Sequence, residues 1–169
     1  MKFAKSVAAA IVALGIGAWA YFALGTPTPN APAPDVGYTL LDGSRSNLAA
    51  LRGKVVLVNF WATTCTTCVR EMPQLAATHE RFKARGLETL AVALRTDPPA
   101  AVIRFAETRR LPFGVVIDNT GAIAKGFGDV QLTPTSFVVD KRGVIVERYV
   151  GAPDFAVLQR LIDRLLRES

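Results

Sequence analysis

The sequence predicts an α/β domain with a central mixed β-sheet and helices on both faces. The first indication is the run from Val55 to Trp61, which is apolar except at Asn59 and rich in β-branched residues, a pattern typical of a strand buried on both faces. The second is the alternation of segments after this run, in the order β-α-β, then α, then β-β-α. This order predicts a mixed sheet covered by helices.

Turn residues and helix-ending residues set the boundaries of the first elements. The Asp42-Gly43 pair is a turn signal and predicts an N-terminal β-hairpin that includes Tyr38 to Leu40. Residues 48–51 should form one helical turn. The helix after the central strand is expected over residues 66–83 and should end at Gly86, because glycine readily adopts the left-handed conformation found at helix ends.

The middle of the chain adds two strands and two helices. Residues 87–93 form a second apolar run and predict a second buried strand. Pro98-Pro99 opens a helix that extends to about Thr108, because proline is well tolerated in the first helical turn. A short strand at 115–117 and a short helix around 123–127 follow.

The last elements are a hairpin and a helix. Strands are expected at 136–139 and 144–149, joined by a turn at 140–143. A closing helix is expected over 153–166, because Leu158 and the apolar residues three, four, seven and eight positions later lie on one helical face.

The N-terminus predicts a membrane anchor. Lys2 and Lys5 precede residues 6–24, an uncharged apolar stretch that would be about 28 Å long as a helix, against a hydrocarbon core of roughly 30 Å. The two lysines favour a cytoplasmic N-terminus and place the domain outside the cytoplasm. A cleaved signal peptide is the alternative, since Ala23 to Gly25 offers small residues, but the apolar run is longer than the usual signal core.

A proline-rich linker follows the predicted anchor. Residues 25–34 contain four prolines in ten residues and should form an extended spacer. The expected organisation is therefore an anchor at 1–24, a linker at 25–34 and a globular domain at 35–169. Both interpretations of the N-terminus place this domain in an oxidising compartment. The expected location is the bacterial inner membrane, with a single-pass anchor and with the domain in the periplasm.

The charge distribution argues against nucleic-acid binding. Without Lys2 and Lys5 the chain carries 18 basic and 14 acidic residues, a small surplus. The basic pairs Arg109-Arg110 and Lys141-Arg142 are isolated and do not form a basic stripe interleaved with aromatic residues.

The two cysteines, Cys65 and Cys68, follow the central strand directly and open a helix. At such a position the first sulfur is exposed, the helix dipole favours its thiolate, and the second cysteine lies one turn further on. Cys65 is therefore the expected nucleophile, and Cys68 is expected to resolve the mixed disulfide.

Two other roles for the cysteines are less consistent with the sequence. A structural disulfide would close so small a loop that it would stabilise the fold little. A metal site would need further ligands, and the other soft donors are only His79 and Met72, of which His79 is expected to be a surface residue of the helix. No metal and no cofactor is expected.

The chain resembles the thioredoxin superfamily, and within it the membrane-anchored branch that includes TlpA, ResA and the cytochrome c maturation thioredoxins. The resemblance rests on VVLVNFWATTCTTCVREMP at 55–73 together with Thr133-Pro134-Thr135. It implies a thioredoxin-like fold with a cis peptide bond at Pro134, in a loop opposite the cysteines that binds an extended substrate segment. Residues 96–127 resemble the αβ insertion of this branch.

The resemblance also implies roles for single residues. Asn59 replaces the buried Asp of cytoplasmic thioredoxin and cannot shuttle a proton, whereas Glu71 matches a Glu that lies beside the cysteines in ResA-like proteins. Glu71 is therefore expected to manage the proton of Cys68. Trp61, Thr64, Thr133 and Pro134 are the expected substrate-binding residues, although relatives usually carry Trp where this chain has Thr64.

These features predict a periplasmic thiol:disulfide oxidoreductase, acting as a reductase of oxidised protein partners in cytochrome c maturation or a related assembly. A membrane electron donor of the DsbD or CcdA type would reduce the pair again. Two alternatives remain open from the sequence: a thiol peroxidase of the peroxiredoxin type, although no proline precedes Cys65 in Phe60 to Thr64, and a copper-handling binding module.

Overall fold

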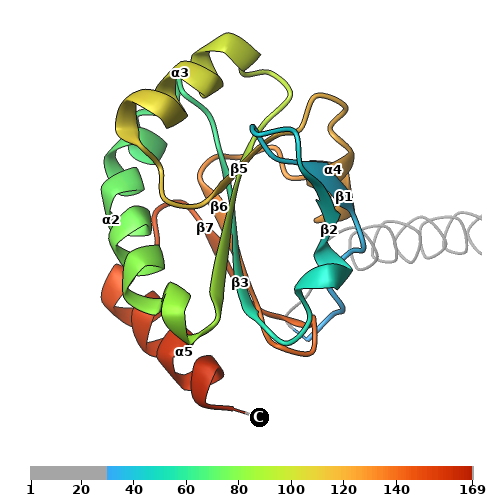
Figure 1. The fold of residues 1–169 in the computed structure, drawn as a ribbon, viewed down its shortest axis with the longest axis vertical. Coiled ribbons are helices and arrows are strands. Elements are labelled where there is room, and N and C mark those ends of the chain that lie inside the picture. Colours follow the sequence, from blue (N-terminus) through green and yellow to red (C-terminus); the bar gives the residue numbers. More distant parts are fainter. Residues whose placement is uncertain (1–29, 169) are drawn as a thin grey trace, which may run out of the picture.

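The computed structural model describes residues 30–168, which form a five-stranded sheet between two layers (Figure 1). The strand order is β5-β4-β3-β6-β7. β3 at the centre pairs parallel with β4 and antiparallel with β6, and β5 and β7 form the edges. The predicted mixed sheet is confirmed. The strands are β3 (Val55–Trp61), β4 (Leu87–Ala93), β5 (Gly114–Ile117), β6 (Thr135–Val139) and β7 (Ile145–Val150).

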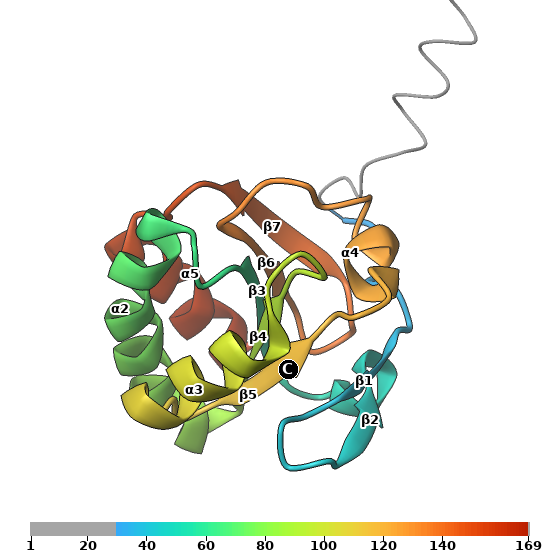
Figure 2. The ribbon, with the colours of Figure 1, turned by 90° about the horizontal axis from the view of Figure 1, so that it is seen from above.

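Helices cover both faces of the sheet (Figures 1 and 2). One face carries the three long helices α2 (Thr66–Phe82), α3 (Pro99–Arg109) and α5 (Phe155–Arg167). The other face carries the hairpin of β1 (Gly37–Thr39) and β2 (Arg45–Asn47), the 3-10 turn η1 (Leu48–Leu51) and the short helix α4 (Ala122–Gly126). All of these elements were predicted, and the predicted bounds differ from the observed ones by at most two residues, because helix and strand ends depend on cap geometry.

The central strand β3 supplies side chains to both cores. Val55, Leu57 and Trp61 pack beneath α2 and α5, whereas Val56, Val58 and Phe60 pack beneath α4 and the hairpin. Successive side chains of a strand point to opposite faces, so this alternation places every second residue on the side of α2. Asn59, a polar residue in a fully buried strand, consequently points toward α2.

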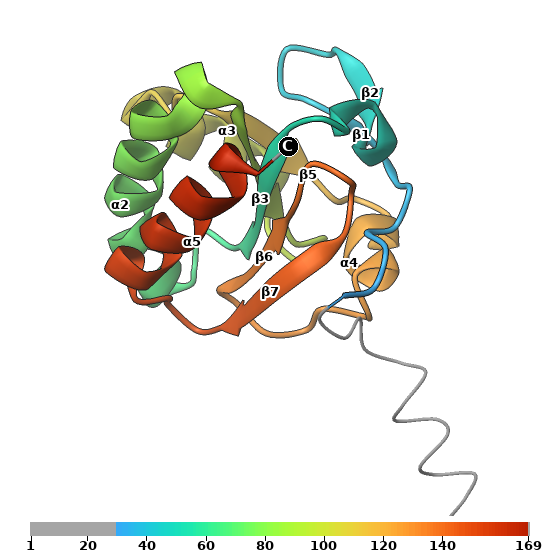
Figure 3. The same cartoon turned by 90° about the horizontal axis from the view of Figure 1, so that it is seen from below.

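Helix α2 begins at Thr66, as the sequence predicts, and ends at Phe82, one residue before the predicted end. Its N-cap is Cys65, whose Sγ accepts a hydrogen bond of 3.1 Å from the N–H of Cys68. Its C-terminus continues into the 3-10 turn η2 (Lys83–Arg85), which ends at Gly86 with a φ of 104°, in the left-handed region. Helix α5 lies along α2 (Figure 3), and the Thr78 hydroxyl accepts a hydrogen bond of 2.9 Å from Gln159.

One prediction about α2 is wrong. His79 is buried rather than on the surface, with Nδ1 3.2 Å from the Thr89 hydroxyl and its ring edge-on to Phe113. His79 lies four residues after Leu75 and so shares its inward helical face. Phe113, directly before β5, packs against this face. The apolar periodicity of α2 alone does not predict that contact.

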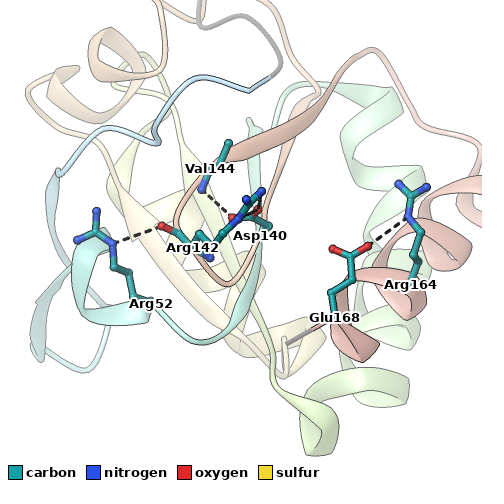
Figure 4. Close-up of polar contacts among 6 residues, drawn as sticks. All are labelled: Arg52, Asp140, Arg142, Val144, Arg164 and Glu168. Atoms are coloured by element: carbon teal, nitrogen blue, oxygen red, sulfur yellow. Dashed lines mark hydrogen bonds and ion pairs between the residues drawn. The ribbon is translucent and has the colours of Figure 1, made fainter.

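The β6–β7 turn closes the end of the sheet where β3 begins (Figure 4). The Asp140 carboxylate accepts hydrogen bonds of 3.0 and 2.9 Å from the backbone N–H groups of Arg142 and Val144, and it also pairs with the Arg142 guanidinium. Arg52 Nε donates to the Arg142 carbonyl at 3.5 Å, which ties η1 to this turn. The cysteines follow the opposite end of β3, so this polar cluster is remote from them.

The globular domain begins earlier than the sequence predicts. The N–H of Asn30 donates to the Ile145 carbonyl at 2.7 Å, and the N–H of Ala33 donates to the Gly143 carbonyl at 2.8 Å. Residues 30–33 of the predicted linker are therefore paired with Gly143 in the β6–β7 turn and with Ile145 at the start of β7. The predicted anchor at 6–24 and residues 25–29 lie outside the described residues; among residues 30–168, no helix is both long enough and apolar enough to span a membrane.

An aromatic cluster beneath α4 predicts a large stability effect. The Phe137 ring has no exposed surface and lies 4.8 Å from the Phe127 ring and 5.9 Å from the Phe60 ring. Phe137→Ala should lower the free energy of unfolding by about 3–5 kcal/mol, because it leaves a cavity among these rings. Urea denaturation followed by circular dichroism measures this loss. Val150→Ala, at a side chain that is 57% exposed on β7, is the control, and equal losses in the two variants would contradict the assigned packing.

Candidate active site

The two cysteines form a disulfide at the start of α2, with their Cα atoms 5.2 Å apart. Cys65 is partly exposed, and Cys68 is fully buried one turn further into the helix. The predicted geometry of the pair is thereby confirmed. A protein partner can reach only the sulfur of Cys65, so any mixed disulfide must form there.

The N-terminus of α2 surrounds the Cys65 sulfur with positive potential. The N–H of Cys68 donates to Cys65 Sγ, and the helix has no acidic residue in its first turn to oppose its dipole. Both features stabilise a negative charge on sulfur in the reduced state. Cys65 therefore has the surroundings that a nucleophilic thiolate requires.

The loop that precedes β6 faces the disulfide. The carbonyl oxygen of Thr133 lies 3.6 Å from Cys65 Sγ, and the Thr133–Pro134 peptide bond is cis, as the resemblance implies. Pro134 is buried and its carbonyl accepts a hydrogen bond of 2.8 Å from Gly151, whereas Thr133 is partly exposed. Substrate pairing along this loop remains a prediction.

Glu71 is a buried carboxyl group one helical turn after Cys68. Its side chain is 3% exposed, and Oε1 accepts a hydrogen bond of 3.0 Å from the Asn59 amide, which also donates to the Ser136 hydroxyl at 3.0 Å. Glu71 Oε2 has no hydrogen-bond partner among residues 30–168. Burial raises the pKa of Glu71 to about 7, and the hydrogen bond from Asn59 opposes this shift. Near neutral pH this group can accept or release a proton.

A second buried carboxylate holds the loop that leads to Cys65. Asp97 is 3% exposed and accepts hydrogen bonds from the N–H and the hydroxyl of Thr63, at 2.6 and 2.5 Å. Asp97 was not among the residues predicted for the site. Its position after β4 was a usable signal, because β3 and β4 are parallel and their carboxyl ends meet at the same edge of the sheet.

Two of the expected substrate-binding residues, Trp61 and Thr64, differ in their exposure. Trp61 has no exposed surface and packs against Phe105, with ring centroids 5.0 Å apart, so the expected contact between Trp61 and substrate is wrong. The pleat of β3 turns this side chain into the core beneath the long helices. Thr64 is exposed beside Cys65 and is placed where a partner can touch it.

The soft donors other than the cysteines do not form a metal site. His79 and Met72 are both buried in the core, and within residues 30–168 no three His, Cys, Asp or Glu side chains gather as a metal-binding group. The arrangement present is a disulfide-bonded cysteine pair with one accessible sulfur, together with a carboxyl group that can accept a proton. That arrangement can perform thiol–disulfide exchange.

Known proteins are similar to the chain over most of its length. Residues 28–162 match the Redoxin family. The chain is 35% identical over 134 residues to the thiol-disulfide oxidoreductase ResA of Bacillus thuringiensis subsp. konkukian, covering 79% of this chain and 76% of that protein. It is 30% identical over 160 residues to ResA of Halalkalibacterium halodurans, covering 94% and 90%.

A solved structure supports the same assignment. The solution structure of a thioredoxin candidate from Neisseria meningitidis superposes with a TM-score of 0.76 at 37% identity, covering 84% of this chain and 93% of that one. Fold, cysteine geometry and sequence similarity thus agree. The chain belongs to the Redoxin family, within the thioredoxin superfamily, and is a ResA-like thiol-disulfide oxidoreductase.

Proposed function

We propose that this protein reduces disulfides of periplasmic proteins, in cytochrome c maturation or a related assembly. The observation that carries the proposal is the spacing of Cys65, Cys68 and Glu71, which lie on successive turns at the start of α2 and pass from partly exposed to buried. Residues three apart lie on one side of a helix, so nucleophile, resolving sulfur and proton acceptor are neighbours.

The reaction takes place in two exchange steps. The Cys65 thiolate attacks one sulfur of the partner's disulfide, which forms a mixed disulfide and releases the other partner sulfur as a thiolate. Cys68 then attacks Cys65 Sγ, which forms the Cys65–Cys68 bond and releases the partner's second sulfur. Two electrons pass to the partner, and the protein is left in the disulfide form that the structure describes.

Glu71 manages the proton of the second step. Cys68 is buried and must lose its proton before it attacks. The ionised carboxyl group of Glu71 accepts this proton one turn away, and its pKa of about 7 keeps both of its protonation states accessible at neutral pH. The Asn59 amide holds Glu71 Oε1 in place for this transfer.

The direction of electron flow is motivated by the N-terminal sequence. Residues 6–24 are apolar and uncharged and follow Lys2 and Lys5, which favours a single-pass anchor in the inner membrane with the domain in the periplasm. A dithiol in an oxidising compartment needs a supply of electrons. A membrane donor of the DsbD or CcdA type would provide them to this tethered domain.

Removal of the resolving sulfur should trap the partner. In Cys68→Ala the mixed disulfide on Cys65 cannot be resolved within the chain, so partner proteins should remain covalently attached. Affinity purification under non-reducing conditions followed by mass spectrometry identifies them. Cys65→Ala is the matched control and should trap far less, because Cys68 is buried. Equal trapping by the two variants would contradict the assignment of Cys65 as nucleophile.

Glu71→Gln should slow the resolving step. In the unsubstituted chain the rate should rise with pH through about 7, as the carboxyl group ionises and becomes able to accept the proton. The variant should lose this inflection and be slower by about 10²-fold above pH 7. Stopped-flow measurement of the decay of a preformed mixed disulfide tests both statements. An unchanged pH profile would exclude Glu71 as the proton acceptor.

The same variant should gain stability at high pH. The fold raises the pKa of Glu71 from 4.5 to about 7, so stability is lost as pH rises from the lower value through the higher one. Gln does not ionise. The free energy of unfolding of Glu71→Gln minus that of the unsubstituted chain should therefore be about 3 kcal/mol larger at pH 8 than at pH 4. Urea denaturation of the disulfide form at the two pH values measures this difference. This gain separates a proton-transfer defect from misfolding.

The redox state in intact cells tests the direction. A reductase that is supplied with electrons should be found largely as the dithiol when cells are quenched with acid and alkylated. Deletion of the membrane donor should shift Cys65 and Cys68 to the disulfide. A pair that is fully oxidised while the donor is present would overturn the reductase direction, while leaving the exchange chemistry intact.

A further inference from the structure

A groove of about 500 Å³ is lined by residues of α3, by Pro98 and by Thr63, which belongs to the loop before Cys65. Its walls are mostly apolar, with Ala101, Phe105 and Pro98 among the lining residues. Thr63, which lines the same groove, is two residues before Cys65, a separation of at most about 7 Å along the chain. We call this feature the α3 groove.

The end of the α3 groove nearest the cysteines is rigidly held. Thr63 is fixed by its two hydrogen bonds to the buried Asp97 carboxylate, and Phe105 is packed against the buried Trp61 ring. These contacts join the groove to the central strand and to the loop that carries Cys65. A segment bound beside Thr63 therefore lies next to the loop that carries the reactive sulfur.

Two arginines give the α3 groove a positive charge. Arg104 and Arg109 line it, both side chains are exposed, and the Arg109 guanidinium lies 5.2 Å from the centre of the Phe105 ring. Neither arginine is paired with a carboxylate within residues 30–168, whereas Arg85 and Arg167 are both paired with Asp163. Glu107 is the one acidic residue of α3 and does not line the groove.

We propose that the α3 groove binds the segment of the oxidised protein partner that flanks its reactive cysteine, and that it selects a segment with an apolar side chain and an adjacent carboxylate. The inference rests on the proposed reductase function and specifies its substrate class. The apolar walls bury the apolar side chain, and the unpaired guanidinium groups attract the carboxylate. A positively charged side chain on the partner segment would be repelled by the two arginines, so the groove distinguishes acidic from basic segments.

Matched peptides test this selection. Each carries one cysteine in a mixed disulfide with 2-mercaptoethanol, flanked by Leu and Glu, by Leu and Lys, or by Ser and Glu. The reduced full chain, in detergent micelles, should react about fivefold faster with the Leu-Glu peptide than with either of the others at low salt. The advantage over the Leu-Lys peptide should shrink at high ionic strength, because exposed charges are screened.

Substitution of the arginines should remove the charge preference. The double variant Arg104→Gln and Arg109→Gln should react with the Leu-Glu and Leu-Lys peptides at similar rates. Arg45→Gln with Arg160→Gln is the matched control, because both side chains are exposed, neither lines the groove, and the change in net charge is the same. A preference that persists in the groove variant, or that disappears in the control, would overturn the inference.

An uncharged disulfide separates the two proposals. If the unsubstituted chain fails to reduce 2-hydroxyethyl disulfide, the reductase function itself fails. If it reduces that compound but shows no preference among the three peptides, only the selective role of the groove is lost. A dimer of the unsubstituted chain that dissociates in the groove variant would instead assign the groove to a second copy of this chain and overturn the inference.

Discussion

The burial of β3 on both faces and along both edges is the constraint on which the rest of the structure depends. A strand between β4 and β6 with a core on each side has no freedom of register, because a shift by one residue would exchange the two cores. Its carboxyl end therefore lies at a fixed point, beside the start of β6. Cys65 follows four residues later and meets the Thr133 carbonyl there.

The same register places one polar side chain in the core beneath α2. Asn59 points toward α2 and bridges Glu71 to Ser136 at the start of β6. The bridge joins the helix of the cysteines, the central strand and the strand that follows Pro134. It leaves Glu71 Oε2 without a partner among residues 30–168, so ionisation of this carboxyl group is disfavoured in the fold. A stability penalty at the active site thus accompanies a group that can exchange a proton at neutral pH.

Chemistry and selectivity are located on different parts of the molecule. The redox pair and Glu71 belong to the start of α2, which packs on the sheet, whereas the α3 groove lies on the surface of the αβ insertion. Asp97 connects the two, because it lies between β4 and α3 and holds Thr63 in the loop before Cys65. Residues of the insertion surface can therefore vary in charge without disturbing the exchange reaction itself.

The sequence by itself determined the order of the elements, the mixed sheet, and the Cys65–Cys68 pair at a helix start. These are local properties: apolar periodicity, glycine and proline positions, and the spacing of two cysteines. Only the tertiary structure decided that Trp61 is inaccessible, that His79 is buried, that Asp97 holds the active-site loop, and that residues 30–33 pair with the domain. Each of these depends on which distant segment covers a given face, and side-chain periodicity within one element specifies a face but not the segment that packs against it.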